Sequence, residues 1–245
     1  MLENNNDNLK TGRHRMFLLG ILCLSAFCLV AQVNPNRRGP QPAKSKVFLL
    51  HSDVLKKNKK NPDAQILVGD VAFRHDSIYM YCDSACFYEK SNSLEAFDNV
   101  KMVQGDTLFL YGDYLFYDGN AQIAQVRNNV RMENRTITLE TDSLNYDRVA
   151  NLGYFFDGGT LMDEENVLTS DWGEYSPATK WSVFNYEVKL VNPQFTLTSD
   201  TLRYNTMSKV ASIVGPSNID SKENHIYSEL GFYNTQFGQA ELLNR

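Results

Sequence analysis

The sequence predicts an all-β fold of the elongated, antiparallel repeat kind, and three observations lead to this prediction. One tyrosine recurs every 29 residues, and two further columns keep the same register. Runs of alternating apolar and polar residues fill each repeat, as expected of half-buried strands. Tyrosine and phenylalanine are abundant, with 13 and 14 copies, and aromatic residues favour strands over helices.

The first 31 residues have the pattern of an export signal. Residues 1–15 are polar and 16–30 form an uninterrupted apolar run, after which Ala31 supplies a small residue at the expected cleavage point. A retained N-terminal anchor is the alternative, although the run is shorter than the roughly 20 residues of a bilayer span. We therefore expect export, with residues 1–31 either cleaved as a signal peptide or kept as an anchor.

Residues 32–60 are expected to form a linker that ends in a basic segment, and 61–245 a β-repeat domain. The basic segment contains Lys56, Lys57, Lys59 and Lys60. It could contact lipid phosphates, but such a run is more often a solvated loop. The net charge is −5, and a nucleic-acid-binding groove needs clustered Lys and Arg, so no nucleic-acid partner is expected.

The repeat is visible as three aligned columns, which is the mark of a repeat architecture. One column is almost entirely apolar, one is tyrosine throughout, and one is mostly acidic. Their members are Tyr81, Leu110, Leu139, Leu168, Leu197 and Ile226; Tyr88, Tyr117, Tyr146, Tyr175, Tyr204 and Tyr233; and Ser84, Asp113, Asp142, Asp171, Asp200 and Glu229.

Within a repeat, the apolar alternation changes parity halfway along. In TITLETDSLNYDRVANLGYFF (136–156) Ile137 and Leu139 are apolar, and Leu144 and Tyr146 continue the series on even numbers. A change of parity without loss of the pattern indicates an inserted residue, hence a bulge or corner, here at 141–142. The same change recurs at 199–200, and a turn rich in Asp, Asn, Gly, Ser and Pro follows each tyrosine of the column.

The inward positions carry large apolar side chains, which form either a packed core or the lining of an open groove. The pattern leaves both possibilities open. The candidate lining residues are Leu108, Leu110, Leu115, Ile137, Leu139, Leu144, Leu168, Phe195, Leu197 and Leu202.

No constellation typical of an enzyme is present. His14, His51, His75 and His225 share no repeat column, show no metal-ligand spacing and are expected to be exposed or in loops. The acidic column is expected to lie at corners and to accept backbone N–H bonds, with calcium coordination as the alternative. No nucleophile elbow, phosphate-binding glycine loop or zinc motif occurs, so we expect neither catalysis, nor a metal, nor a cofactor.

Beyond residue 31 the chain has two cysteines, Cys82 and Cys86. On one straight strand an offset of four residues separates them by about 13 Å, beyond the roughly 7 Å limit for a disulfide. They could pair only if the chain turned between them. We therefore expect two small, unpaired, buried or half-buried side chains.

The repeats resemble the OstA-like, LptA/LptC-type proteins of lipopolysaccharide transport from about residue 66 to the C-terminus. The resemblance depends on NVKMVQGDTLFLYGDYLFYDGNAQIAQVRNNVRM (99–132), and VKLVNPQFTLTSDTLRYNTMSKVASIVG (188–215) repeats the pattern. It implies a β-jellyroll whose apolar interior shields acyl chains, with lipopolysaccharide or lipid A as ligand. It also implies a periplasmic location and joining to other OstA/Lpt-type proteins through edge strands.

Residues and resemblance together predict a non-enzymatic carrier or bridge of lipopolysaccharide transport that contributes to outer-membrane assembly. Two alternatives stay open. One is a structural or adhesive β-solenoid with a packed core and no ligand, and the other is a component anchored in the inner membrane like LptC.

Overall fold

The computed structural model describes residues 45–59 and 61–243. The predicted signal or anchor, 1–31, lies outside the described residues. All regular elements of the described chain are β-strands, which confirms the all-β prediction. The described part of the chain contains no helix of the length and hydrophobicity needed to cross a bilayer.

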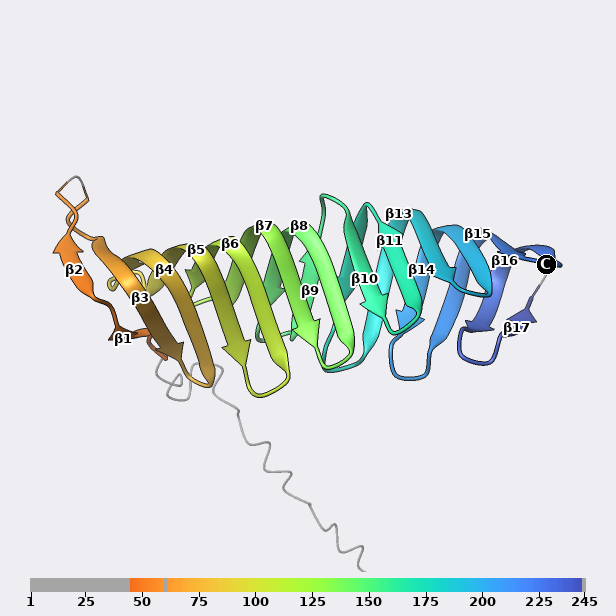
Figure 1. Cartoon of the computed structure of the whole chain (residues 1–245), viewed down its shortest axis with the longest axis horizontal. Helices are drawn as coiled ribbons and strands as arrows, with labels where there is room; N and C mark the ends of the chain where they lie inside the picture. Colours follow the sequence, from red (N-terminus) through yellow and green to blue (C-terminus); the bar gives the residue numbers. More distant parts are fainter. Residues whose placement is uncertain (1–44, 60, 244–245) are drawn as a thin grey trace, which may run out of the picture. The chain divides into compact units, whose positions relative to one another are not determined.

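The strands join into a single sheet in which all pairs are antiparallel and most strands pair with the next one in the chain (Figure 1). They are β1 (Phe48–His51), β2 (Val54–Lys57), β3 (Gln65–His75), β4 (Ile78–Tyr88), β5 (Ser93–Gln104), β6 (Leu108–Asp118), β7 (Ile123–Asn134), β8 (Ile137–Asp147), β9 (Leu152–Phe155), β10 (Gly159–Asp163), β11 (Asn166–Ser170), β12 (Trp172–Tyr175), β13 (Trp181–Asn192), β14 (Phe195–Asn205), β15 (Val210–Ser221), β16 (His225–Asn234) and β17 (Gln239–Leu242).

Each long strand bends at its middle, so that the sheet folds over into two layers (Figure 1). The bend coincides with a register shift, for example between Arg127 and Val130 of β7, opposite Asp142 of β8. The parity change predicted at 141–142 is therefore confirmed as a bulge. The extra residue lies on the partner strand, where two residues of β7 stand opposite one of β8.

The bulge is made by consecutive residues in the left-handed backbone region. Asn128 and Asn129 have φ of 61° and 50°, and Asp98 and Asn99, one repeat earlier, have 60° and 49°. Asn and Asp tolerate this region better than other non-glycine residues, since their short polar side chains bond locally. Asn and Asp therefore suit the bends of β5 and β7, whereas the bulge of β13 is formed by Tyr186 and Glu187, with φ of 67° and 51°.

A substitution at Asn128 tests this explanation of the bend. Replacing it with valine places a β-branched side chain at φ 61°, and we expect a loss of about 1–2 kcal/mol of unfolding free energy. Asn128→Gly should leave stability unchanged or slightly raised, since glycine adopts this conformation freely. Urea denaturation of both variants measures the difference. Equal stabilities of the valine and glycine variants would show that the left-handed backbone conformation at Asn128 does not determine the bend.

The apolar residues between the two layers form one continuous buried cluster, from Val47 to Tyr233. Phe155 at the end of β9 occupies the space left by two glycines. A Cβ added at Gly159 would lie 2.7 Å from the Phe155 ring, and one at Gly173 would lie 2.5 Å from it. Here the continuous strands of other repeats are broken, since β9 and β10 both pair with β8.

The sheet begins before residue 61, where the sequence placed the start of the β domain. β1 pairs with one half of β3 and β2 pairs with the other, so part of the predicted linker, 32–60, belongs to the sheet. Both strands are short and mostly exposed, and Lys56 and Lys57 lie on β2. Because no face of β2 is buried, its sequence has no apolar alternation to reveal it.

Candidate functional site

The candidate lining residues all lie inside the core. Each has between 0% and 5% of its surface exposed and belongs to the single buried cluster. The clefts described below include none of them in their walls. In this structure the interior is therefore packed, and access for a ligand would require the two layers to move apart. The residues concerned are Leu108, Leu110, Leu115, Ile137, Leu139, Leu144, Leu168, Phe195, Leu197 and Leu202.

Along the edge opposite the bends, the two layers meet through polar contacts between hairpin ends. We call this edge the seam. Its inner side is formed by the tyrosine column: Tyr117, Tyr146, Tyr175 and Tyr204 have at most 1% of their surface exposed. Burial is the main reason why the pKa of each of these hydroxyls is raised, to about 12 for Tyr146. They therefore stay protonated at neutral pH and can act as hydrogen-bond donors.

The strongest seam cluster joins Tyr204 of β14 to Asp163 of β10. The Tyr204 hydroxyl donates to Asp163 Oδ2 at 2.7 Å, and the Lys209 ammonium donates to Asp163 Oδ1. Asp163 is completely buried, and the Lys209 side chain is 13% exposed. Glu164 lies 3.5 Å from the same ammonium at the surface. An ion pair thus closes the seam, with its carboxylate inside the protein.

One repeat earlier, the corresponding cluster has a neutral amide, Asn134, in the place of the Asp163 carboxylate. The Tyr175 hydroxyl and the Lys180 ammonium both donate to Asn134 Oδ1, each at 3.1 Å. Asn134 has 4% of its surface exposed, and its Nδ2 donates to the Thr107 carbonyl at 3.3 Å. The amide is thereby held with its oxygen toward the tyrosine and the lysine.

A third cluster contains His75 at the end of β3. Its Nδ1 lies 2.6 Å from the Tyr117 hydroxyl, which also accepts from Arg148 Nη1 at 2.9 Å. His75 is fully buried, so the expectation that it would be exposed or in a loop is wrong. Burial lowers the pKa of His75, Asp76 opposes this, and the Arg148 charge adds to it. The histidine is therefore neutral at pH 7 and serves as a structural partner of the tyrosine.

The seam pairs join residues about 41 positions apart, such as Tyr204 with Asp163 and Tyr175 with Asn134. The repeat register could have suggested them, because the partners Asn134 and Asp163 are themselves 29 residues apart. Sequence reasoning identified the tyrosine column without assigning its partners.

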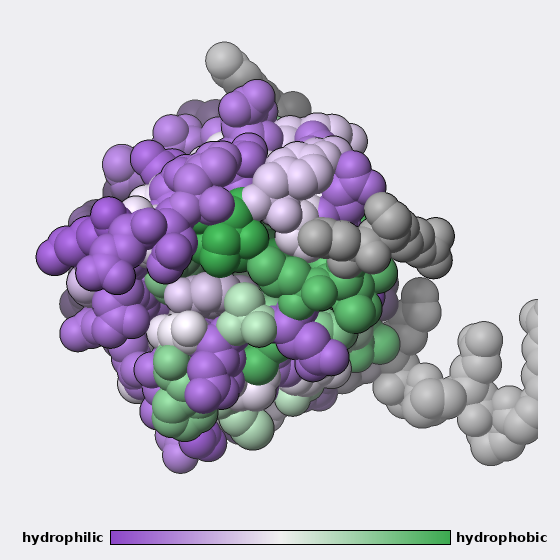
Figure 2. All heavy atoms as spheres, turned by 90° about the vertical axis from the view of Figure 1, so that its right-hand side faces the viewer, coloured by the Kyte–Doolittle hydropathy of each residue, from purple (hydrophilic) through white to green (hydrophobic). Residues whose placement is uncertain are grey.

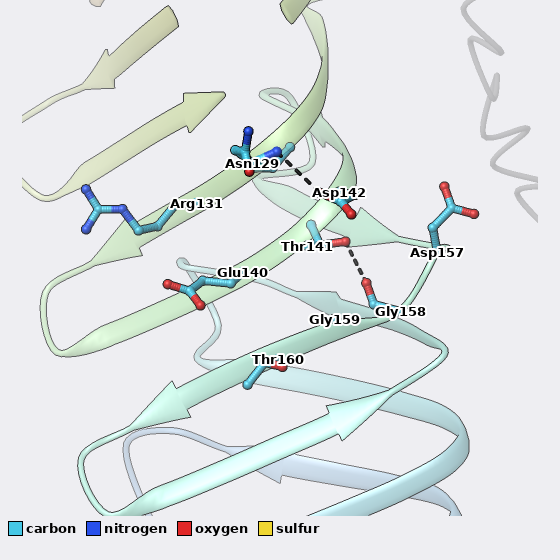
Figure 3. Close-up of a pocket in the computed structure, with 10 residues that line it drawn as sticks. Asn129, Arg131, Glu140, Thr141, Asp142, Asp157, Gly158, Gly159 and Thr160 are labelled. Carbon is cyan, nitrogen blue, oxygen red and sulfur yellow. Dashed lines mark hydrogen bonds between the residues drawn. The ribbon is translucent and has the colours of Figure 1, made fainter. Parts of the chain in front are cut away.

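The acidic column lies at the bends, as expected. Asn129 donates its backbone N–H to Asp142 Oδ1 at 3.3 Å (Figure 3). Its side-chain amide donates to Asp113 Oδ2 at 2.6 Å. The expectation of a bond from a backbone N–H is therefore confirmed at Asp142. In the described residues, no group of three His, Cys, Asp or Glu side chains is placed to hold a metal ion.

The structure contains both Cys82 and Cys86 as free thiols, as their spacing predicted. Cys82 is buried and Cys86 half-buried. Burial raises the pKa of the Cys82 thiol to about 12, and burial followed by the Glu95 charge raises that of Cys86. Thiolate, the reactive form, is therefore scarce at Cys82 below pH 10.

Alkylation with iodoacetamide at pH 8 tests this environment. We expect Cys82 to stay unmodified in the folded protein and to react promptly in urea. Cys86 should react in the folded state more slowly than a free thiol does, because its pKa is raised as well. Peptide mass analysis distinguishes the two sites. Rapid modification of Cys82 under native conditions would show that the layers separate far more readily than the packing indicates.

Among the clefts lined by described residues, a polar one and an apolar one lie on the outer surface of the sheet. The polar one, of about 540 Å³, lies beside the bend at 157–159, between β7, β8 and β10 (Figure 3). Its carboxylates, Glu140, Asp142 and Asp157, point in different directions in this view. The apolar one, of about 660 Å³, lies on the outer face of β13 to β16, with Trp181 and Phe232 in its wall.

Exposed large apolar side chains concentrate at the two ends of the sheet. β1, β2 and β4 carry Phe48, Leu55 and Tyr81, and β16 carries Leu230 and Phe232, each at least 40% exposed. At the C-terminal end, an apolar area extends from the middle of the face to its right side, and hydrophilic residues lie mainly to the left and top (Figure 2). β17 pairs with β16 and with no other described strand, so its outer edge is open.

Comparison with known proteins gives one family match. A family model described as OstA-like protein matches residues 44–200. No curated protein matches the chain. Among solved structures, one match is LptH from Pseudomonas aeruginosa, described as the LptA homologous periplasmic component of the conserved lipopolysaccharide transport device. The two are 11% identical, the match covers 69% of this chain and 94% of that chain, and the TM-score is 0.25.

Proposed function

The chain belongs to the OstA-like protein family, and on this premise we propose that it is an exported, non-enzymatic protein of lipopolysaccharide transport. The observation that carries the proposal is the family match over 44–200, which covers most of the described sheet. In this role the protein would shield acyl chains between its two layers and pass the lipid to a neighbouring protein in the periplasm.

The construction of the seam supports this proposal. The long strands run through the bends from one layer to the other. At the seam, by contrast, side chains join the layers, such as Tyr175 to Asn134 and Tyr204 to Asp163. Separation at the seam would expose apolar residues without breaking any strand pairing. Each acyl CH₂ that enters would gain about 0.8 kcal/mol of transfer free energy. Transfer would thus be an equilibrium process, with direction supplied elsewhere.

The ends of the sheet support a second part of the proposal, the joining of the chain to other OstA/Lpt-type proteins. Unpaired strand edges are templates for another strand, and here exposed apolar side chains accompany the edges at β1 and β17. We expect concentration-dependent association in sedimentation velocity, either with itself or with a periplasmic partner. A strictly monomeric protein that binds no such partner would contradict this part.

A ligand-free structural β-solenoid is the second candidate, and one observation favours it. The ten inward residues are at most 5% exposed, as in an ordinary core. Titration of the purified full-length chain with fluorescently labelled lipopolysaccharide separates the two candidates. If the protein is a carrier, the fluorescence anisotropy of the labelled lipopolysaccharide should rise to saturation, and unlabelled lipopolysaccharide should reverse the rise. A folded protein without saturable binding would support the structural role instead. Retention at the inner membrane, as in LptC, would appear as partition of the chain into the membrane fraction.

A further inference from the structure

Two successive seam clusters have the same architecture and opposite charge. Three positions correspond across 29 residues: Asn134 to Asp163, Arg135 to Glu164, and Lys180 to Lys209. The tyrosines that donate into the two clusters, Tyr175 and Tyr204, are related by the same shift. The later cluster therefore serves as a comparison for the earlier one, since the corresponding positions 134 and 135 differ in charge from 163 and 164.

In the later cluster, the lysine is neutralised. Lys209 bonds the buried Asp163 carboxylate and lies 3.5 Å from Glu164. One cation thus has two acidic partners, and no charge is left over for a ligand of negative charge.

In the earlier cluster, two cations have no acidic partner. Lys180 is half-buried and donates to Asn134 Oδ1, a neutral acceptor already shared with Tyr175. Arg135 is exposed at the adjacent hairpin end. None of the ion pairs between described residues includes either side chain. Burial and then the Arg135 charge lower the pKa of Lys180, in agreement with the absence of a nearby carboxylate.

The backbone conformation at Arg135 and Lys180 is unusual for long side chains. Arg135 and Lys180 have φ of 60° and 65°, where short residues such as Asn and Gly are favoured. At the corresponding positions of the later cluster, Glu164 and Lys209 also have positive φ, and there an ion pair offsets the strain. In the earlier cluster, none of the ion pairs between described residues does so.

We propose that Arg135 and Lys180 form a binding site for a phosphate-type anion on the seam. A guanidinium and an ammonium can both donate to the oxygens of a phosphate group, and charge-assisted hydrogen bonds of this kind are among the strongest in proteins. The inference deepens the proposed lipid transport, since the buried ring of Tyr175 lies directly behind the site. An amphiphile could leave its phosphate here while its acyl chains pass inward. Free phosphate offers the same chemistry without the chains.

Calorimetric titrations of the full-length chain with three probes distinguish these sources. The probes are inorganic phosphate, dihexanoyl phosphatidic acid and dihexanoyl phosphatidylcholine, each below its micelle concentration. If the site binds a lipid head group, phosphatidic acid should bind at least about tenfold more tightly than inorganic phosphate. This corresponds to a difference in binding free energy of about 1.4 kcal/mol. Equal affinities would assign the site to free phosphate. Saturable binding of neither inorganic phosphate nor phosphatidic acid would overturn the proposal.

Matched variants then locate the site. Lys180→Gln and Arg135→Gln should each weaken binding about tenfold or more, since each removes a charge-assisted bond. Lys180→Arg should retain binding. Asn134→Asp combined with Arg135→Glu, which reproduces the later cluster, should abolish it. Lys209→Gln is the control: it should lower stability and leave anion affinity unchanged.

An unchanged anion affinity in Arg135→Gln, whose site is exposed, would contradict the proposal. A loss of anion affinity in Lys209→Gln equal to that in Lys180→Gln would contradict it as well. Circular dichroism confirms that each variant is folded. Because the inorganic phosphate arm needs no acyl chains, it can succeed where lipopolysaccharide binding fails, so the site and the transport function are tested separately.

Discussion

Asp163→Ala is expected to destabilise the protein by about 3–5 kcal/mol, because it leaves a largely buried lysine without its partner. The Asp163 carboxylate is completely buried and accepts from both Lys209 and Tyr204. Without it, the Lys209 ammonium must either stay buried unpaired or move to solvent and open the seam. Urea denaturation, analysed for both the free energy and its slope, measures the loss.

Glu164→Ala is the matched control for this change. Glu164 is the next residue, 61% exposed, and lies 3.5 Å from the same ammonium. Exposed ion pairs contribute about 1 kcal/mol or less, so its loss should be small. Similar losses in the two variants would show that the seam is hydrated and that the buried pair does not hold the layers together.

Phe155→Ala is expected to remove about 3–5 kcal/mol of unfolding free energy, the range for deletion of a buried phenylalanine. Phe155 is 1% exposed, and its ring occupies the space above Gly159 and Gly173. Two glycines cannot fill the cavity that the ring would leave. The cavity would lie where β9 and β10 break the continuous strand, so little backbone pairing is available to compensate.

Phe156→Ala provides the comparison, since Phe156 is the neighbouring residue on the opposite face. It is 44% exposed and lies beneath the Arg127 guanidinium, whose carbon is 5.4 Å from the ring centroid. A partly exposed cation–π contact contributes about 0.5–1 kcal/mol, so a loss near that value is expected. If both alanine variants lost the same free energy, the break at 156–158 would be a loosely packed region.

The sequence predicted the repeat and its bends well because both follow from local rules. The parity change at 141–142 is confirmed as a bulge, and Tyr146, which continues the apolar alternation after it, is fully buried. The resemblance to the OstA-like family is confirmed by the family match. Each of these depends on periodicity along the chain, which burial on one face imposes directly on the sequence.

Features that depend on contacts between the layers were harder to predict. The sequence predicts an exposed or loop position for His75, whereas the residue is buried against Tyr117, 42 positions away. The sequence places β1 and β2 in a linker, because both strands have only four residues and most of these are exposed, which leaves little alternation to detect. The ten inward residues could be identified, but alternation is the same for a packed core and for an open groove, so their role in lipid binding is still a proposal.

Site-specific photo-crosslinking to lipopolysaccharide tests the central claim, that acyl chains are shielded between the two layers. Photoreactive residues placed at the inward Leu139 and Leu197 are compared with the outward neighbours Glu140 and Thr198 on the same strands. The account predicts crosslinks from both inward positions and none from the outward ones. Absence of any inward crosslink in a protein that keeps its β spectrum, or equal crosslinking from both faces, would contradict it.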